Sequence, residues 1–283
     1  MNLDLLKVSN DLANHRKPFA VATVVRVQGS SSAKVGSAAI VDGDGKIIAG
    51  WIGGGCAESA VRHEALSCIE QQHTRTITLD MTDELLGVGM PCGGIMEVFI
   101  EPVLPKPDLL IVGHGRIAET LARLGHLMDF RVTIDDPTAN ANSFPDADCL
   151  ITDDFDLTGP EIGPHSFIVI ATQHKSDHVW LQRALEQDAA YIALVSSRYR
   201  ARLVLDYLVA LGAPAGKVES IWAPAGLDLG AASPEEIALS VMSQIVAVRR
   251  GGSAQSLKAK ETTSNPEPAT DKVITLCDTE GRA

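Results

Sequence analysis

The sequence predicts an α/β protein: a small N-terminal α+β domain followed by a Rossmann-like domain built on a parallel sheet. Two observations lead to this prediction. In the middle of the chain, short continuous apolar strands alternate with helical patterns, which is typical of a parallel sheet covered on both faces. One of these strands runs directly into the glycine-rich turn Gly113-His114-Gly115, which opens a helix.

The chain length and two changes of composition predict the domain boundaries. A chain of 283 residues is typical of two domains. Residues 101–107 contain three prolines, which favour an extended connector over a helix or a central strand. Residues 253–271 are rich in Ser, Thr, Lys, Glu and Pro and have no apolar periodicity. We therefore expect domains over residues 1–103 and 107–251, and a disordered tail over 252–283 in which residues 273–276 are a candidate short strand.

The N-terminal domain is expected to contain a hairpin, a helix and three further strands. β-Branched runs and the turn Asp42-Gly43-Asp44-Gly45 predict the hairpin. Small and apolar residues at helical spacing predict a helix that begins at Ala57. The expected strands are residues 20–28, 38–41, 46–52, 74–79 and 95–100.

The second domain is expected to alternate strands with helices and to end in a long helix. The expected strands are residues 109–112, 131–134, 148–152, 167–171 and 190–195, and the expected intervening helices are residues 116–128 and 179–187. Ser233-Pro234-Glu235-Glu236 has the pattern of a capping box that starts the last helix. Its apolar stripe, formed by Ile237, Val241, Ile245 and Val248, is compatible with a homodimer interface and equally with an internal core.

Charge and composition disfavour several classes of protein. With 24 basic and 36 acidic residues the net charge is −12, and only 4% of residues are aromatic, which argues against binding to nucleic acid or to an anionic membrane surface. No apolar run approaches the ~18 residues of a membrane span, and residues 1–19 do not resemble a signal peptide. We therefore expect a cytoplasmic protein. Five cysteines without a C-x-x-C pair indicate neither a disulfide framework nor a structural zinc site.

The turn after residues 109–112 has the G-x-G-x-x-A spacing of a nucleotide-binding loop. Gly113 permits the tight turn, Gly115 lets a phosphate approach the helix N-terminus, and Ala118 allows close packing of the helix on the strand. Asp135 lies 20 positions after Gly115, where an acid binds a ribose hydroxyl in dinucleotide-binding proteins. The spacing predicts the Rossmann fold and leaves open whether the ligand is NAD(P) or another molecule.

A second glycine-rich motif contains a cysteine. Gly53, Gly54 and Gly55 precede Cys56, which lies at or next to a helix N-terminus, a position that stabilises a thiolate. Cys92 is a second candidate thiol in a glycine-rich segment. The alternative is that both cysteines are small packing residues, and the spacing alone does not decide between the two interpretations.

A metal site at the end of residues 167–171 is a weaker hypothesis. His174, Asp177 and His178 follow this strand, where ligands usually bind in α/β proteins. Two histidines and one carboxylate are also typical of a solvated loop that caps a helix. We favour the loop and expect no metal site.

Six segments, in order, resemble one protein family. The chain is similar to the XdhC/CoxI family of accessory proteins for molybdenum hydroxylases such as xanthine dehydrogenase and carbon monoxide dehydrogenase. The motif GGGCAE, from Gly53 to Glu58, is closer to the CoxI branch. The resembling segments are residues 22–36, 53–58, 112–118, 170–177, 190–200 and 226–250.

The resemblance implies a function that no single motif predicts. It implies a protein that binds molybdenum cofactor, as molybdopterin or its cytosine dinucleotide form, and protects it during sulfuration by a cysteine desulfurase. The cofactor would then be inserted into an apo-molybdenum hydroxylase. The family's cysteine position matches Cys56, and Glu58 follows in the same motif.

Two alternative functions remain open. One is an NAD(P)-dependent oxidoreductase, and the other is a Rossmann protein that senses nucleotides without turnover. Against the first, the sequence shows no Lys/Tyr or His/Asp hydride-transfer set beside the glycine loop. The leading hypothesis is a maturation factor without turnover of its own.

Overall fold

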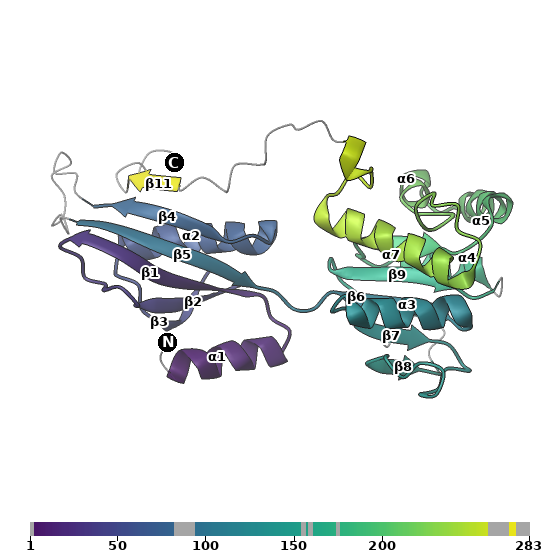
Figure 1. Cartoon of the computed structure of the whole chain (residues 1–283), viewed down its shortest axis with the longest axis horizontal. Coiled ribbons are helices and arrows are strands. Elements are labelled where there is room, and N and C mark those ends of the chain that lie inside the picture. The colour runs from purple at the N-terminus through teal and green to yellow at the C-terminus, as the bar shows by residue number, and fades with distance from the viewer. Residues whose placement is uncertain are drawn as a thin grey trace. The chain divides into compact units, whose positions relative to one another are not determined.

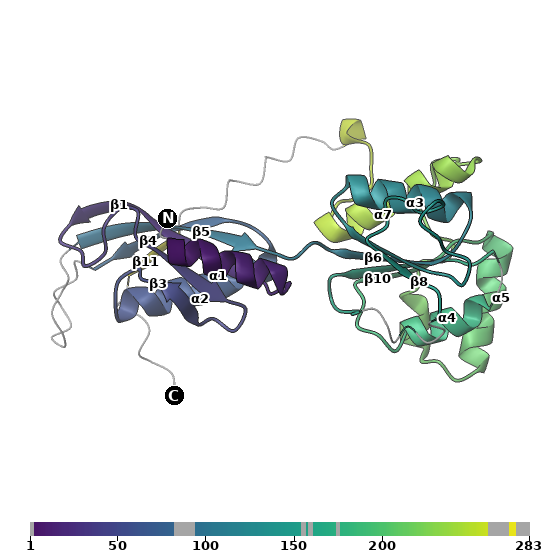
Figure 2. The same ribbon diagram turned by 90° about the horizontal axis from the view of Figure 1, so that it is seen from below.

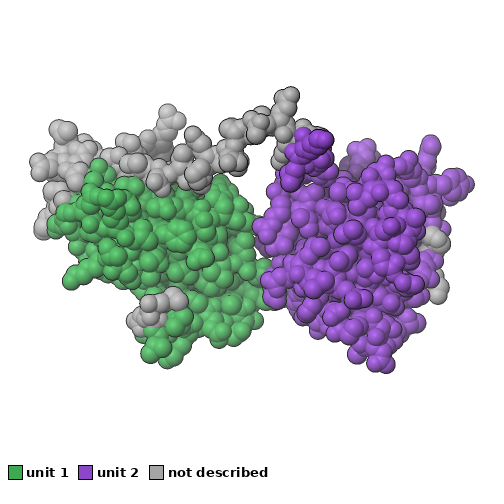
Figure 3. Space-filling model, in the orientation of Figure 1, with its two compact units in different colours: residues 1–105, 262–283 green, residues 106–261 purple. Residues whose placement is uncertain are grey.

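The computed structural model describes residues 3–81, 94–153, 157, 161–173, 176–259 and 272–275. The chain divides into two compact units, residues 1–105 with 262–283 and residues 106–261 (Figure 3). The first unit contains a largely antiparallel sheet and the second a parallel sheet with helices on both faces (Figure 1). The predicted fold class is therefore confirmed.

Within the described residues, the sheet of the first unit has six strands in the order β11-β4-β5-β1-β2-β3. Neighbouring strands are antiparallel except β11, which pairs with β4 in parallel. The strands are β1 (Phe19–Gly29), β2 (Ala38–Asp42), β3 (Ile47–Gly50), β4 (Arg75–Asp80), β5 (Gly94–Val103) and β11 (Lys272–Thr275).

Helices α1 (Leu3–Asn14) and α2 (Cys56–Gln71) pack on opposite faces of this sheet. Alternate residues of β1 explain the arrangement, because successive side chains of a strand point to opposite faces. Ala20 and Ala22 belong to the core under α2, whereas Phe19 belongs to the core under α1. The sequence patterns did not predict α1.

Two predictions concern the ends of this unit. The prolines of residues 101–107 were expected to exclude a helix or a central strand, and β5 continues through Pro102, which pairs with Ala20 of β1. Strand β4 begins opposite Ile100, so beyond that residue β5 has a neighbour on one side only, where proline is tolerated. The candidate short strand of residues 273–276 is present as β11, which begins one residue earlier, with Val273 opposite Thr78. Residues 260–271 and 276–283 lie outside the described residues.

The second unit has a parallel sheet in the order β10-β9-β6-β7-β8. Numbered from β6, this is the 3-2-1-4-5 order of a Rossmann sheet, and its topological switch point lies between β6 and β9. The strands are β6 (Asp108–Gly113), β7 (Arg131–Asp135), β8 (Cys149–Ile151), β9 (Ser166–Ala171) and β10 (Tyr191–Leu194).

Helices cover both faces of the parallel sheet, as Figure 2 shows. Leu109 and Ile111 face α3 and α7, whereas Leu110 and Val112 face α4, α5 and α6. The sequence patterns did not predict α5 or α6. The helices are α3 (Arg116–Leu127), α4 (Asp177–Ala184), α5 (Arg198–Ala210), α6 (Ala215–Glu219) and α7 (Pro234–Arg250), followed by a 3₁₀ turn, Leu257–Ala259.

Helix α7 begins with the predicted capping box: the Ser233 hydroxyl accepts from the Glu236 amide, and the Glu236 carboxylate accepts from the Ser233 amide. Its apolar stripe is part of the internal core, because Val241 and Ile245 are fully buried against the layer formed with α3. The stripe therefore gives no support to a homodimer. Among the described residues, no helix is both long and apolar enough to cross a membrane.

Candidate functional site

The glycine loop of the second unit joins β6 to α3. Gly113 has a φ of 124°, and a Cβ at this position would overlap the carbonyl group of Ala171 at the end of β9. Gly115 precedes the first residue of α3 with a φ of 89°, and no side chain caps the helix. The first amide groups of α3 are therefore available to an anionic ligand. Ala118 is fully buried, as close helix–sheet packing requires.

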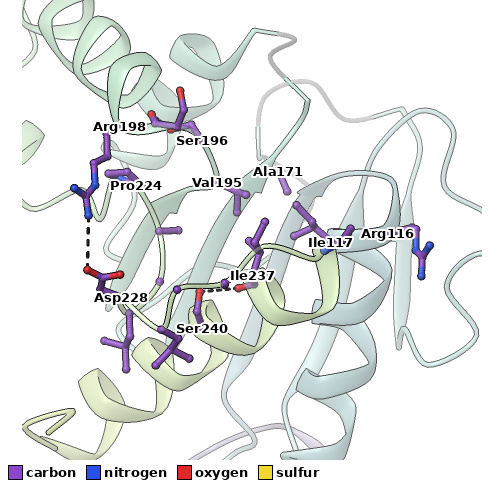
Figure 4. A pocket seen from close by; sticks show the side chains of 18 of the residues that line it. Arg116, Ile117, Ala171, Val195, Ser196, Arg198, Pro224, Asp228, Ile237 and Ser240 are labelled. Atoms are coloured by element: carbon purple, nitrogen blue, oxygen red, sulfur yellow. Dashed lines mark hydrogen bonds and ion pairs between the residues drawn. The ribbon is translucent and has the colours of Figure 1, made fainter.

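Next to this loop lies a large cavity of about 780 Å³ (Figure 4). Its walls are the segments that follow β6, β9 and β10, together with residues 224–231 and the first turns of α7. It therefore lies at the carboxyl ends of the strands and beside the switch point, where open α/β sheets bind ligands. Its apolar lining includes Ile117, Val195, Leu227 and Ile237.

Gln244 of α7 fixes the wall formed by residues 224–231. Its Oε1 atom accepts hydrogen bonds from the Tyr191 hydroxyl at 2.6 Å and from the Gly226 amide at 2.8 Å. Burial raises the pKa of Tyr191 well above its usual range, so the phenol remains a donor. A Cβ on Gly226 would overlap Ser240, so this wall approaches α7 closely because residue 226 is glycine. No sequence motif identified this segment as part of a site.

Two arginines lie on opposite sides of the cavity (Figure 4). Arg198, the first residue of α5, is 3.8 Å from Asp228, and both side chains are more than four-fifths exposed. Arg116, the first residue of α3, contacts Glu235 at 2.5 Å. Exposed ion pairs are weak, so an anionic ligand can compete for both guanidinium groups. The cavity therefore offers cationic groups in a chain whose net charge is −12.

A buried carboxylate joins the loop after β9 to α5. Asp177 is 2% exposed, accepts a hydrogen bond from the Thr172 hydroxyl, and accepts another from Arg200 Nε at 2.9 Å. These bonds position the start of α5, which lines the cavity with Ser196, Ser197 and Arg198.

Asp177 thus makes structural hydrogen bonds. These bonds do not favour the hypothesis that Asp177 binds a metal ion. The ring of His178 packs edge-on against Tyr207, and His174 lies outside the described residues. No group of three or more His, Cys, Asp or Glu side chains arranged for a metal ion is found in the part of the chain that the structure describes.

Asp135 ends β7 and is 1% exposed, and it is not among the residues that line the cavity. The acid that contacts the glycine loop is its neighbour Asp136, whose Oδ2 is 2.8 Å from Nδ1 of His114. This pair was not predicted from the sequence. A signal was present, because His114 occupies the variable position between Gly113 and Gly115, and two acids, Asp135 and Asp136, stand at the end of β7.

In the first unit, α2 begins at Cys56, so the predicted position of this residue at a helix N-terminus is confirmed for the backbone. Gly55 precedes it with a φ of 61° and without a side-chain cap. Gly53 lies beside Ser32 and Ala33, and Glu58 is half-buried in the first turn of α2. The side chain of Cys56 and the whole of Cys92 lie outside the described residues.

Comparison with known proteins identifies both units. The model of the XdhC Rossmann domain matches residues 109–245, and the model of the XdhC and CoxI family matches residues 12–80. The uncharacterized protein YqeB of Escherichia coli is 31% identical over 239 residues, which cover 82% of this chain and 44% of that protein. This chain thus spans less than half of that relative. A probable xanthine dehydrogenase subunit from Bacillus subtilis is 26% identical, with 84% of this chain and 96% of that protein covered.

A crystal structure of a xanthine dehydrogenase from Bacillus halodurans is 23% identical and aligns with a TM-score of 0.47, covering 92% of this chain and 98% of the other. The two family models match separate segments that together make up most of the chain, one in each compact unit. The chain belongs to the XdhC and CoxI family.

Proposed function

We propose that this chain is an accessory protein of a molybdenum hydroxylase of the xanthine dehydrogenase or carbon monoxide dehydrogenase type. It binds molybdenum cofactor as cargo and transfers it to the apo-hydroxylase without turnover of its own. Family membership supports the role, and so does the name of the Bacillus subtilis relative. The observation that carries the proposal is the cavity of about 780 Å³ beside the uncapped N-terminus of α3.

The residues of the cavity suit a phosphate-bearing pterin. The volume falls within the ~300–1,000 Å³ usual for small-molecule sites. The amide groups at the start of α3 suit the phosphate, and Arg116 and Arg198 supply positive charge for an anionic cargo. Ile117, Val195 and Ile237 supply an apolar surface for the ring system of the pterin.

We assign the sulfuration step of this proposal to the first unit. Cys56 is the first residue of α2, where the partial positive charge of the helix end favours a thiolate. Gly54 and Gly55 lie in open surroundings, because nothing lies within 4 Å of a Cβ placed on either residue. A thiolate in this position suits the transfer of sulfur from a cysteine desulfurase, which is the second proposed partner.

The competing proposal, NAD(P) as the ligand, is supported by the Rossmann topology alone. The segment after β7, where the ribose-binding acid of a dinucleotide site lies, supplies none of the residues that line the cavity. The cavity instead lies at the ends of β6, β9 and β10, and no described residue of the segments after β7 and β8 lines it. This arrangement does not favour NAD(P).

The test is anaerobic reconstitution with molybdenum cofactor, followed by gel filtration and analysis of molybdenum and pterin in the protein fraction. We expect about one of each per chain, and no displacement by NAD⁺. Tight binding of NAD⁺ together with absence of molybdenum and pterin would refute the proposal in favour of a nucleotide-binding protein.

A matched pair of variants locates the site. Arg198→Gln should weaken cofactor binding about tenfold, because it removes a charged hydrogen-bond donor from the cavity wall. Arg202→Gln is the control: it changes an exposed arginine of the same helix that is also 3.8 Å from an aspartate but does not line the cavity. Equal effects of the two variants would mean that the arginines act only through net charge.

A further inference from the structure

His114 is held in place on two sides. Its Nδ1 atom is 2.8 Å from Asp136 Oδ2, and its backbone carbonyl accepts a hydrogen bond from Gln173 Nε2 at 3.4 Å. The imidazole is about one-third exposed and lines the cavity, whereas Asp136 is 7% exposed and does not line it. A buried carboxylate thus orients a ring that a bound ligand can reach.

Asp136 makes its contacts in this arrangement as an ionised carboxylate. Its Oδ1 atom accepts hydrogen bonds from the amide and the hydroxyl of Thr138, while Oδ2 faces His114. Burial alone would raise the pKa of Asp136, but the hydrogen bonds from Thr138 and His114 outweigh it and lower the pKa. The carboxylate is therefore charged at neutral pH and is not available to bind a ribose.

The geometry points to a role for His114. A carboxylate next to Nδ1 stabilises the tautomer in which Nδ1 carries the proton, which leaves the lone pair of Nε2 at the opposite edge of the ring. We propose that Nε2 of His114 is the proton acceptor of the cavity. The ligand then presents an N–H or O–H group to His114, a donor that the pyrimidinone ring of a pterin possesses.

Proton transfer from such a group to His114 needs no other reactant. The X–H bond of the ligand breaks, the Nε2–H bond forms, and the resulting imidazolium charge is stabilised by Asp136. Asp136 is next to Asp135, where the ribose-binding acid of a dinucleotide site lies, and its contacts with His114 and Thr138 leave it unable to serve as that acid. This inference rests on the proposed use of the cavity as a ligand site, but its first test requires no ligand.

The first test is long-range ¹H–¹⁵N NMR of the full chain labelled with ¹⁵N-histidine, with the His114 signals assigned by their loss in His114→Asn. We expect the neutral ring of His114 to carry its proton on Nδ1, with Nε2 unprotonated, and this tautomer to lose its dominance in Asp136→Asn. Dominance of the tautomer with the proton on Nε2 in the wild type would overturn the proposal.

The second test is cofactor binding by His114→Asn, whose amide N–H can still contact Asp136 but which lacks the Nε2 acceptor. Binding of molybdenum cofactor should weaken about tenfold relative to the wild type. His126→Asn, at the exposed end of α3, is the control and should bind normally. Unchanged binding by His114→Asn would overturn the inference. If the wild type itself binds no cofactor, the proposed function fails, and the NMR result alone decides the role of His114.

Discussion

Two glycine-rich loops precede helices in this chain, residues 53–55 before α2 and residues 113–115 before α3. In both loops the last glycine has a positive φ and no side chain caps the helix. Their surroundings differ. A Cβ on Gly113 would overlap Ala171, and a Cβ on Gly115 would lie 2.5 Å from Gln173 Nε2, whereas nothing lies within 4 Å of a Cβ on Gly54 or Gly55.

The difference shows which glycines the fold requires. Gly113 and Gly115 are necessary for packing or backbone conformation whether or not a ligand binds, so substituting them cannot separate binding from folding. Gly54 has neither constraint: its surroundings are open and its φ is not in the left-handed region. A glycine that packing does not explain is the better probe of ligand contact.

The largest expected effect is that of Gly113→Ala compared with Gly54→Ala. The first variant should lose about 3–5 kcal/mol of unfolding free energy, because it combines a backbone overlap with a φ of 124°. The second should change the unfolding free energy by no more than about 0.5 kcal/mol. Denaturant unfolding measures both. Similar losses in the two variants would contradict the contrast between the loops.

The next largest effect is expected when the buried carboxylate of a carboxylate–arginine pair is neutralised, and each unit contains such a pair. Glu64, 1% exposed, accepts from Arg75 at 2.6 Å, and Asp177 accepts from Arg200 at 2.9 Å. Arg75 is 17% exposed and Arg200 is 33% exposed. When the carboxylate partner is neutralised, water therefore solvates the charge of Arg75 less well than the charge of Arg200. We expect Glu64→Gln to cost about 3 kcal/mol and Asp177→Asn about 2 kcal/mol in unfolding free energy. The opposite order would show that burial does not control these pairs.

A smaller effect is expected in the alkylation rates of two cysteines of the first unit, Cys56 and Cys68. Cys68 is fully buried, and burial raises the pKa of its thiol, with an opposing contribution from Arg75. Alkylation of native protein by iodoacetamide should be at least about tenfold faster at Cys56, on the first residue of α2, than at Cys68. Mass spectrometry of timed samples measures the rates, and equal rates in denatured protein are the control. Slower reaction at Cys56 than at Cys68 would refute the proposed thiolate.

The smallest expected effect is the pH dependence from Asp136. Its pKa is lowered in the folded chain, so its contribution to stability is complete above the unfolded-state pKa of about 4 and is lost as pH falls through the folded value. Between pH 7 and pH 3 the wild type should therefore lose more thermal stability than Asp136→Asn. Equal losses would mean that the hydrogen bonds to Asp136 do not depend on its charge.

Sequence periodicity was sufficient for much of the fold but not for α5. Strand β9, with all six residues buried, and helix α7, with its capping box, have strong local signals. Helix α5 buries Ala201, Val204 and Leu208 but exposes Tyr199 and Leu203 among others, so its apolar residues do not form one stripe. Its position depends on tertiary contacts such as the bond between Arg200 and Asp177.

The site was predicted only in part for a related reason. The glycine loop is a local motif, so its spacing could be recognised along the chain. The pair of His114 and Asp136 joins residues 22 positions apart, and the choice of Asp136 over Asp135 depends on which side chain turns toward the loop at the end of β7. The cavity wall of residues 224–231 is held by Gln244, a contact between distant segments that periodicity does not encode.

Hydrogen–deuterium exchange of the full chain, with and without molybdenum cofactor under anaerobic conditions, tests the central claim most directly. If the cargo binds in the cavity, amides of residues 114–118, 195–199 and 225–231 should exchange more slowly when cofactor is present, because these segments form its walls. Protection confined to residues 53–58, or no protection in either unit, would contradict the account.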